Sequence, residues 1–333
     1  MGTDSSSPAS SATPRAIQDP DARGSTGALG SRAFELSGRT VLLAMDGSAG
    51  ATAGARVAHA LAKTHGAVVH VIGVIDSRSV PFPPAMIDTL AIEDPDRDVP
   101  SHQDQVQAIR SSLSTITGQL IGWPIHIMIG TPSSSILEQA SHLDAALIII
   151  GLHRHGRVDR ALNNETSLNV MRNSSCPVLG VVPGVTSLPV RILAATDFSA
   201  RSLIASRTAR AIAGDGAALV LAYVPPLFAL LGDEGEHVIH DLGVREAFEM
   251  AALELGNQGV SFDHIVLEPN ASKSTASTIL EYAASSSADL IAAGTRQRGR
   301  VERWMLGSVS TELVRDGTHS VLIVPPTHVA PHE

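Results

Sequence analysis

Cysteine and lysine are scarce in this chain. Cys176 is the single cysteine among 333 residues, which excludes an internal disulfide and a zinc site built from several cysteines, and is typical of a reducing cytosol. The two lysines, Lys63 and Lys273, leave few candidates for Schiff-base chemistry. The net charge of -9 argues against general binding to nucleic acids or to anionic membranes. A local basic patch would still suit a single phosphate compound.

Long hydrophobic runs are also absent from the sequence. The strongest apolar run, from Ala145 to Ile150, is far shorter than the roughly 20 residues that a membrane-spanning helix needs. The first 30 residues are rich in serine, alanine, proline and glycine and lack the basic start and apolar segment of a secretory signal. We therefore expect a cytoplasmic protein with a disordered N-terminal tail over residues 1–36.

The chain contains one sequence unit twice. Residues 136–183 align without gaps on residues 279–326, and more than a third of the aligned positions are identical. Upstream, residues 41–46 match residues 191–197 at a different offset, so loops differ in length between the copies. A hydrophobic content of 44% and a length suited to about two domains agree with two packed cores.

Short β-branched runs alternate with longer segments of helical period in both copies. The first copy predicts strands at 39–45, 67–75, 125–129, 146–151 and 178–183, and helices at 50–65, 102–118, 133–142 and 164–173. The second copy predicts strands at 190–196, 217–224, 262–267, 289–294 and 320–325, and helices at 200–213, 240–256, 274–285 and 308–316. The fold class is therefore α/β, with two tandem doubly wound parallel-sheet domains over residues 37–185 and 188–329.

The last predicted strand of each copy is an apolar sheet edge. An unpaired apolar edge strand promotes aggregation, so residues 178–183 and 320–325 are expected to pair with each other. This pairing predicts a pseudo-twofold arrangement of the two domains within one chain.

Ligands of doubly wound sheets bind beyond the carboxyl ends of the strands, where the winding direction reverses. In the second copy, Asp197, Val224 and Gly294 lie at these ends, and the segment Gly307-Ser308-Val309-Ser310 opens a helix. Backbone N–H groups at a helix N-terminus favour phosphate, and four arginines precede this helix at positions 296, 298, 300 and 303. A simple capping turn with solvated arginines would produce the same local pattern.

The spacing of glycines in this segment adds a resemblance. Gly294-Thr295-Arg296-Gln297 is followed after nine residues by Gly307-Ser308, which is the spacing G-x2-G-x9-G-[ST] with glutamine at the second glycine. Together with the stretch Ala194-Ala195-Thr196-Asp197-Phe198-Ser199, the strand order and the duplication, this segment resembles the universal stress protein family over both copies. The resemblance implies a Rossmann-like fold of the adenine nucleotide alpha hydrolase type.

The resemblance also implies a ligand site. Some members of this family bind ATP through the glycine loop, whereas members without the loop do not. In this chain the implied nucleotide-binding residues belong to the second copy: Ala195, Asp197, Val224, Gly294, Arg296, Gly307, Ser308, Val309 and Ser310. A glutamine in place of a glycine of positive φ costs about 1 kcal/mol and crowds a phosphate, so Gln297 is expected to weaken binding without excluding it.

The first copy lacks the end of the glycine loop. It keeps Asp46 and Gly151, but Arg154 occupies the place of Gln297, and Asn164 and Glu165 occupy the places of Gly307 and Ser308. A carboxylate at Glu165 complements the helix N-terminus and repels phosphate. The first copy is therefore expected to be empty of ATP.

Three classes of function remain open at this stage. The first is a stress-response regulator or sensor that binds ATP or another adenine nucleotide in its second domain, with Mg²⁺ accompanying ATP, and that associates as a homodimer or with another protein. No catalytic residue is evident, so at most slow ATP hydrolysis is expected. The second class is a nucleotide-free protein-interaction module with a vestigial loop. The third is an enzyme such as an adenylate-forming transferase. The sequence contains no Walker loop and no nucleophile elbow.

Other candidate sites are weaker. His237 and His240, with neighbouring carboxylates, are interpreted as an exposed polar helix start rather than a metal cluster. His153 and His155 are interpreted as solvated loop residues, although they would suit an anion at low pH. Cys176 is predicted to be a buried, inert thiol.

Overall fold

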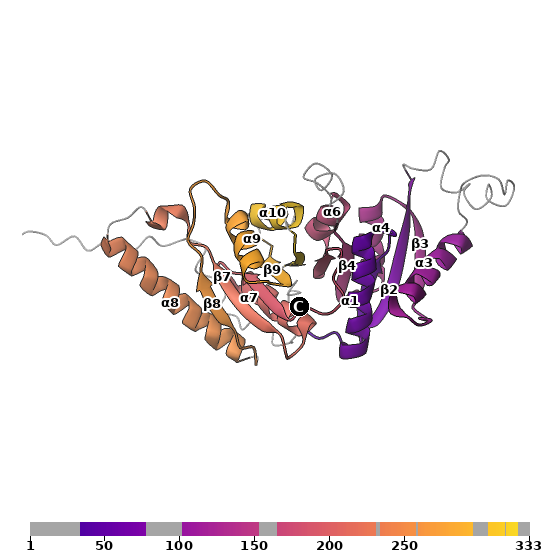
Figure 1. The fold of residues 1–333 in the computed structure, drawn as a ribbon, viewed down its shortest axis with the longest axis horizontal. Coiled ribbons are helices and arrows are strands. Elements are labelled where there is room, and N and C mark those ends of the chain that lie inside the picture. The colour runs from indigo at the N-terminus through magenta and orange to yellow at the C-terminus, as the bar shows by residue number, and fades with distance from the viewer. Residues whose placement is uncertain are drawn as a thin grey trace, which may run out of the picture. The chain divides into compact units, whose positions relative to one another are not determined.

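The computed structural model describes residues 34–77, 102–152, 165–230, 234–257, 259–295, 306–316 and 318–325. The first copy contains β1 (Thr40–Ala44), α1 (Ala49–His65), β2 (Val68–Asp76), α3 (His102–Thr117), β3 (Ile125–Gly130), α4 (Pro132–His142), β4 (Leu147–Gly151), α6 (Glu165–Asn173) and β5 (Val178–Val181). The second copy contains β6 (Arg191–Ala195), α7 (Ala200–Ala213), β7 (Ala218–Tyr223), the 3-10 helix η4 (Leu227–Leu230), α8 (Glu234–Gly256), β8 (Asp263–Val266), α9 (Thr275–Ser285), β9 (Leu290–Gly294), α10 (Ser308–Asp316) and β10 (Ser320–Val324). In Figure 1 the first copy runs from indigo to magenta and the second ends in yellow.

The strands form one sheet in the order β3-β2-β1-β4-β5-β10-β9-β6-β7-β8. Within each copy the strands are parallel. The strand order changes direction after the third strand, and the fourth strand lies on the other side of the first, as in a doubly wound fold. The two copies meet where β5 and β10 pair antiparallel, with Leu179 opposite Leu322. This confirms the predicted α/β class, the doubly wound order and the pairing of the two last strands.

Residues of the central strands alternate between two packed faces. Leu42 and Ile148 belong to a core that also includes buried residues of α4, α6, α9 and α10. On the other face, a side chain at Gly54 of α1 would meet Ile149 at 3.2 Å and Leu43 at 3.4 Å. All four of these strand residues are fully buried. Burial on both faces explains why the strands appear in the sequence as continuous apolar runs.

The second copy differs from the sequence prediction in three places. Helix α8 begins at Glu234, so the predicted boundary at residue 240 is wrong, and His237 and His240 lie in the first two turns of the helix. Strand β7 ends at Tyr223, so Val224 follows it, and the short helix η4 was not predicted.

Candidate functional site

Each copy carries an Asp-X-Ser turn between its first strand and first helix. The Asp46 carboxylate accepts a hydrogen bond from the Ser48 N–H at 2.9 Å, and the Asp197 carboxylate accepts one from the Ser199 N–H at 3.2 Å. The two serines then cap α1 and α7, because the Ser48 hydroxyl accepts a hydrogen bond from the Ala51 N–H and the Ser199 hydroxyl accepts one from the Ser202 N–H. Both aspartates are exposed, so each turn presents a carboxylate to solvent.

The middle residue of this turn distinguishes the copies. Its backbone is left-handed in both, with φ 78° at Gly47 and 60° at Phe198. A non-glycine residue held in this conformation costs about 1 to 3 kcal/mol. In the second copy aromatic packing offsets the cost, since the Phe198 ring lies 4.9 Å from Tyr223 and 4.8 Å from Phe248 between ring centres.

These rings belong to an aromatic cluster of Phe198, Tyr223, Phe248 and His264, in which the last two lie 4.3 Å apart. Burial, together with the charge of Asp197, raises the pKa of the Tyr223 phenol. Sequence reasoning missed the cluster. The only signal was Phe198 itself, a bulky residue in a turn where the first copy has glycine.

Gly294 at the end of β9 is explained by packing inside the protein. A Cβ at this position would lie 2.9 Å from the Arg201 carbonyl oxygen and 3.2 Å from the Ser202 nitrogen, both in α7. The first copy repeats this contact, because a Cβ at Gly151 would lie 2.7 Å from the carbonyl carbon of Gly50. The first glycine of the motif therefore allows a helix N-terminus to approach the strand end, whether or not a ligand binds.

Ser310 also has a structural partner. Its buried hydroxyl donates to the Gly294 carbonyl at 3.3 Å, and Ser167 in the first copy donates to the Gly151 carbonyl at 3.2 Å. The hydroxyl thus ties α10 to the end of β9, as Ser167 ties α6 to β4. Both copies hold the helix after the loop in the same way.

No contact with the described residues explains why position 307 is a glycine. Its φ is outside the left-handed region, and no described residue lies within 4 Å of the place where its Cβ would be. It is followed by the exposed Ser308, with which α10 begins, and no acidic residue lies in the first turn of that helix. In the first copy α6 begins with the exposed Glu165 in the same position. Of the two helix starts, only that of α10 has no acidic residue in its first turn.

The sheet brings the other predicted residues together at the carboxyl ends of its strands. Strand β6 lies between β7 and β9, with Ala195 opposite Ala222 and Ala194 opposite Ala292. The carboxyl ends that carry Ala195, Val224 and Gly294 are therefore neighbours at the point where the strand order reverses. Ala195, Val224 and Val309 are half-buried.

One polar group at the carboxyl ends of these strands has no hydrogen-bond partner among the described residues. The Thr295 side chain, directly after β9, is 3% exposed, and its Oγ1 makes no hydrogen bond within the described ranges. A buried hydroxyl without a partner costs about 1 to 3 kcal/mol. Arg296, Gln297 and the arginines at 298, 300 and 303 lie outside the described residues, as do His153, His155, Arg154 and Asn164.

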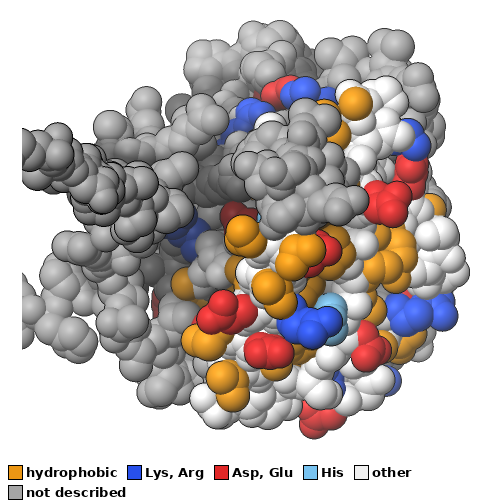
Figure 2. Space-filling model, turned by 90° about the vertical axis from the view of Figure 1, so that its left-hand side faces the viewer, with side chains coloured by type: hydrophobic (Ala, Val, Ile, Leu, Met, Phe, Trp, Pro, Cys, Tyr) orange, Lys and Arg blue, Asp and Glu red, His pale blue; other side chains and the backbone are white. Residues whose placement is uncertain are grey.

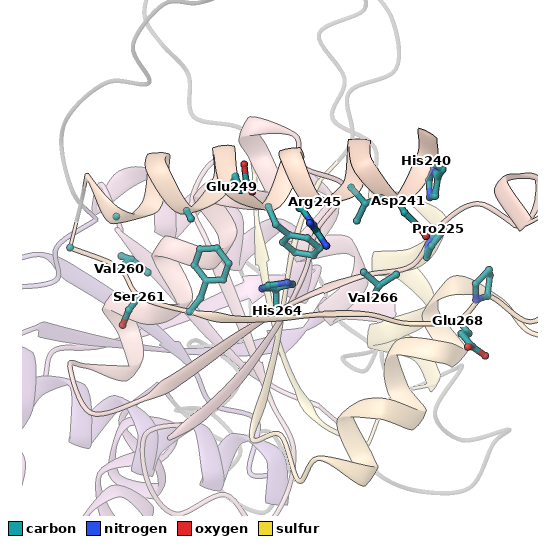
Figure 3. Close-up of a pocket in the computed structure, with 17 residues that line it drawn as sticks. Pro225, His240, Asp241, Arg245, Glu249, Val260, Ser261, His264, Val266 and Glu268 are labelled. Carbon is teal, nitrogen blue, oxygen red and sulfur yellow. The ribbon is translucent and has the colours of Figure 1, made fainter. Parts of the chain in front are cut away.

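A cavity of about 1110 Å³ lies between α8 and β8, beside the aromatic cluster. Figure 3 shows Arg245 extending from α8 toward the side where His264 of β8 lies. His240 also lines it, and its buried Nε2 has no hydrogen-bond partner within the described part of the chain. None of the predicted nucleotide-binding residues that the structure describes lines this cavity.

The weaker candidates give little chemistry. Burial raises the pKa of the half-buried Cys176 thiol, which supports the prediction of an inert thiol. Within the described ranges no three histidine, cysteine, aspartate or glutamate side chains gather where they would hold a metal. The described helices include none that combines the length and the apolar character needed to cross a membrane.

The model of the universal stress protein family matches residues 38–182 and again residues 190–325. Among solved structures, a universal stress protein from Archaeoglobus fulgidus DSM 4304 is similar at 19% identity and a TM-score of 0.58, covering 86% of this chain and 98% of the other. A functionally unknown protein from Pseudomonas aeruginosa PAO1 is similar at 18% identity and a TM-score of 0.58, covering 86% of this chain and 92% of the other. At such identities these structures show the fold alone.

The search of curated proteins found no match. The family model covers most of the chain and matches it twice, in agreement with the duplicated sequence and the doubled strand order. The chain is therefore a member of the universal stress protein family with two family domains in tandem.

Proposed function

We propose that the second domain binds an adenine nucleotide, with its phosphates at the start of α10 and its adenosine end toward Asp197. The observation that carries this proposal is Gly307. Neither its φ nor a described neighbour requires glycine, and it stands before a helix start that has no acidic residue. A close approach of ligand phosphate to the backbone would explain why a side chain is absent there.

The first turn of α10 supplies the phosphate contacts. Its backbone N–H groups at Ser308 and Val309 have no partner within a helix, because the first N–H groups of any helix lack one. The exposed Ser308 hydroxyl is a further donor. Each hydrogen bond to a charged group contributes about 1.5 to 3 kcal/mol, and the helix dipole adds a smaller term of the same sign.

The adenosine contacts lie at the ends of β6 and β7. Asp197 is held in a fixed orientation, because its Oδ1 accepts hydrogen bonds from both the N–H and the hydroxyl of Ser199. An oriented carboxylate suits a ribose hydroxyl or an adenine amino group. Ala195 and Val224 add small apolar surfaces beside it, which suit the face of a purine.

The first domain serves as an internal comparison. It repeats the Asp46 turn, the Gly151 contact and the Ser167 hydrogen bond, so its scaffold is the same. It differs at Glu165, an acidic residue in the first turn of α6, whose charge would repel phosphate from that helix start. We propose that this domain does not bind ATP and that one nucleotide binds per chain.

ATP bound here would carry Mg²⁺, which neutralises phosphate charge when it is present. No described residue is placed to activate a water molecule, so the proposed role is that of a cytoplasmic stress-response regulator that senses nucleotide, with at most slow hydrolysis. Nine site residues take part in the proposal, namely Ala195, Asp197, Val224, Gly294, Arg296, Gly307, Ser308, Val309 and Ser310. Association as a homodimer belongs to the same proposal.

The experiment is a comparison of two matched variants by calorimetric titration with MgATP. Gly307→Asp places a carboxylate at the α10 start and is expected to abolish binding. Asn164→Asp makes the same change at the equivalent position of the first domain and is expected to leave the affinity and the stoichiometry unchanged. Equal losses in both variants would contradict the proposed asymmetry. No binding by the wild-type chain would favour a nucleotide-free interaction module.

A further inference from the structure

Helix α8 is apolar on its outer face as well as its inner face. Phe248, Ala251 and Leu255 are buried against the domain. On the opposite side five large apolar residues are 59 to 72% exposed: Val238, Ile239, Leu242, Met250 and Leu253. Figure 2 shows hydrophobic side chains gathered on this side of the molecule. An exposed apolar stripe of this size marks a surface that another surface covers.

The fold itself does not demand this outer face. Helix α3 takes the place of α8 in the first domain and buries Ile109 and Leu113 on its inner side. Its exposed residues are mostly polar: His102, Gln103, Asp104, Gln107, Ala108, Arg110, Ser111 and Thr115. The apolar outer face is therefore specific to α8.

The spacing of residues along the exposed stripe is symmetric about its centre. Ile239, Leu242, Glu246, Met250 and Leu253 follow one another at steps of three, four, four and three residues. At about 100° per residue, all five lie within about 40° of a line along the helix through Glu246. A stripe with this symmetry matches itself when a second helix is turned by 180° about an axis through Glu246.

We propose that this stripe binds α8 of a second copy of the chain in an antiparallel helix pair. Leu242 then faces Met250 of the partner subunit, and Ile239 faces Leu253 of the partner subunit. A contact in which each copy contributes the same patch closes as a twofold dimer and leaves no apolar surface open for a third copy. The paired segments extend about 21 Å along each helix, from Ile239 to Leu253.

Charge sets the strength of this contact. The exposed Glu246 lies on the twofold axis and meets its own copy, and the exposed Glu249 lies beside the stripe. Like charges this close repel, and salt screens them. The dimer should therefore tighten as ionic strength rises, and Glu246→Gln should tighten it at low salt. An interface built on opposite charges would weaken under the same conditions.

The first test is sedimentation equilibrium of the full chain at low and high salt. Leu242→Glu and Met250→Glu are each expected to weaken self-association about 100-fold or more. Leu120→Glu is the matched control, because Leu120 is a leucine of the first domain that is 86% exposed and lies away from the stripe. It should leave the dimer unchanged. Circular dichroism and thermal unfolding show that each variant is folded.

The second test concerns the register. The double variant Leu242→Lys/Met250→Glu should restore the dimer, because each introduced lysine faces an introduced glutamate across the axis, twice per dimer. The double variant Leu242→Lys/Leu253→Glu should not, since its introduced charges face apolar residues. Equal behaviour of the two double variants would overturn the antiparallel pairing.

A monomeric wild-type chain at the highest soluble concentration and high salt would overturn the proposal outright. A chain that dimerises only after removal of residues 1–33 would do so as well, because it would identify the chain's own N-terminal segment as the occupant of the stripe. Neither result bears on nucleotide binding, which is measured separately.

Discussion

Two histidines on neighbouring strands of the first domain predict a stability that depends on pH. The Nδ1 of His70 on β2 and the Nε2 of His126 on β3 lie 3.0 Å apart, and their rings are stacked with centres 5.3 Å apart. Only a pair with at least one neutral ring can share a proton in this way. Burial lowers the pKa of His70, and burial together with the charges of His70 and His142 lowers the pKa of His126.

The direction of the effect follows from these shifts. Each histidine has a lower pKa in the folded chain than its ordinary value of 6.5, so the unfolded chain binds more protons in this range. The stabilisation is fully present above pH 6.5 and is lost as the pH falls from there through the lowered pKa values. Two charged rings at 5.3 Å repel by roughly 1 to 3 kcal/mol for effective dielectric constants between those of water and a protein surface.

The second domain supplies the control. Leu42 lies opposite His70, and its counterpart Leu193 lies opposite Val220. His126 corresponds in the same way to Ile265. The double variant His70→Val/His126→Ile therefore installs an apolar pair that this fold already accommodates, without introducing a new charge.

The assay is urea unfolding at pH 7.5 and at pH 5.5, followed by circular dichroism. The wild-type chain should lose about 1 to 3 kcal/mol of unfolding free energy in its first transition between these values, and the double variant should lose clearly less. Equal losses in the two proteins would refute the assignment of the pH dependence to this pair. A single His126→Ile variant should remove part of the difference, because the repulsion between the rings is gone while burial still lowers the pKa of His70.

Three further predictions concern single side chains. Gly294→Ala should lower the unfolding free energy by about 1 to 3 kcal/mol in chemical denaturation, because its Cβ would press on the backbone of α7, and an unchanged value would refute the close contact. Phe198→Gly should relieve the left-handed backbone yet still destabilise the chain by about 1 to 2 kcal/mol through loss of ring packing, and a more stable variant in thermal unfolding would show that strain outweighs packing. The Cys176 thiol should react slowly with a disulfide reagent at pH 8 in the native chain and rapidly in urea, since burial raises its pKa, and a fast native reaction would contradict this.

The sequence predicted most of the fold because its strands are buried on both faces. Runs such as Leu147–Gly151 are apolar throughout, and the repeat gave each strand a second, independent example. The pairing of β5 with β10 could also be predicted, since an exposed apolar edge is unfavourable. The start of α8 was placed six residues too late, because the cluster of histidine and acidic residues gives no clear boundary between loop and helix.

Only the features of the candidate site that depend on the local spacing of residues could be predicted. The spacing indicated Gly294 and Ser310, but their main contacts are with α7 and β9, which no spacing reveals. The aromatic cluster depends on the backbone conformation of Phe198 and on the position of α8. The histidine pair depends on the register between β2 and β3, so neither feature was predicted.

The measurement that tests the central claim most directly is a count of nucleotide per chain. The purified protein is saturated with MgATP, freed of unbound ligand, and examined by native mass spectrometry with chromatographic identification of the released nucleotide. One adenine nucleotide per chain, lost in Gly307→Asp and kept in Asn164→Asp, is the predicted result. Two nucleotides per chain would contradict the role given to Glu165, and none would contradict the nucleotide site at the start of α10.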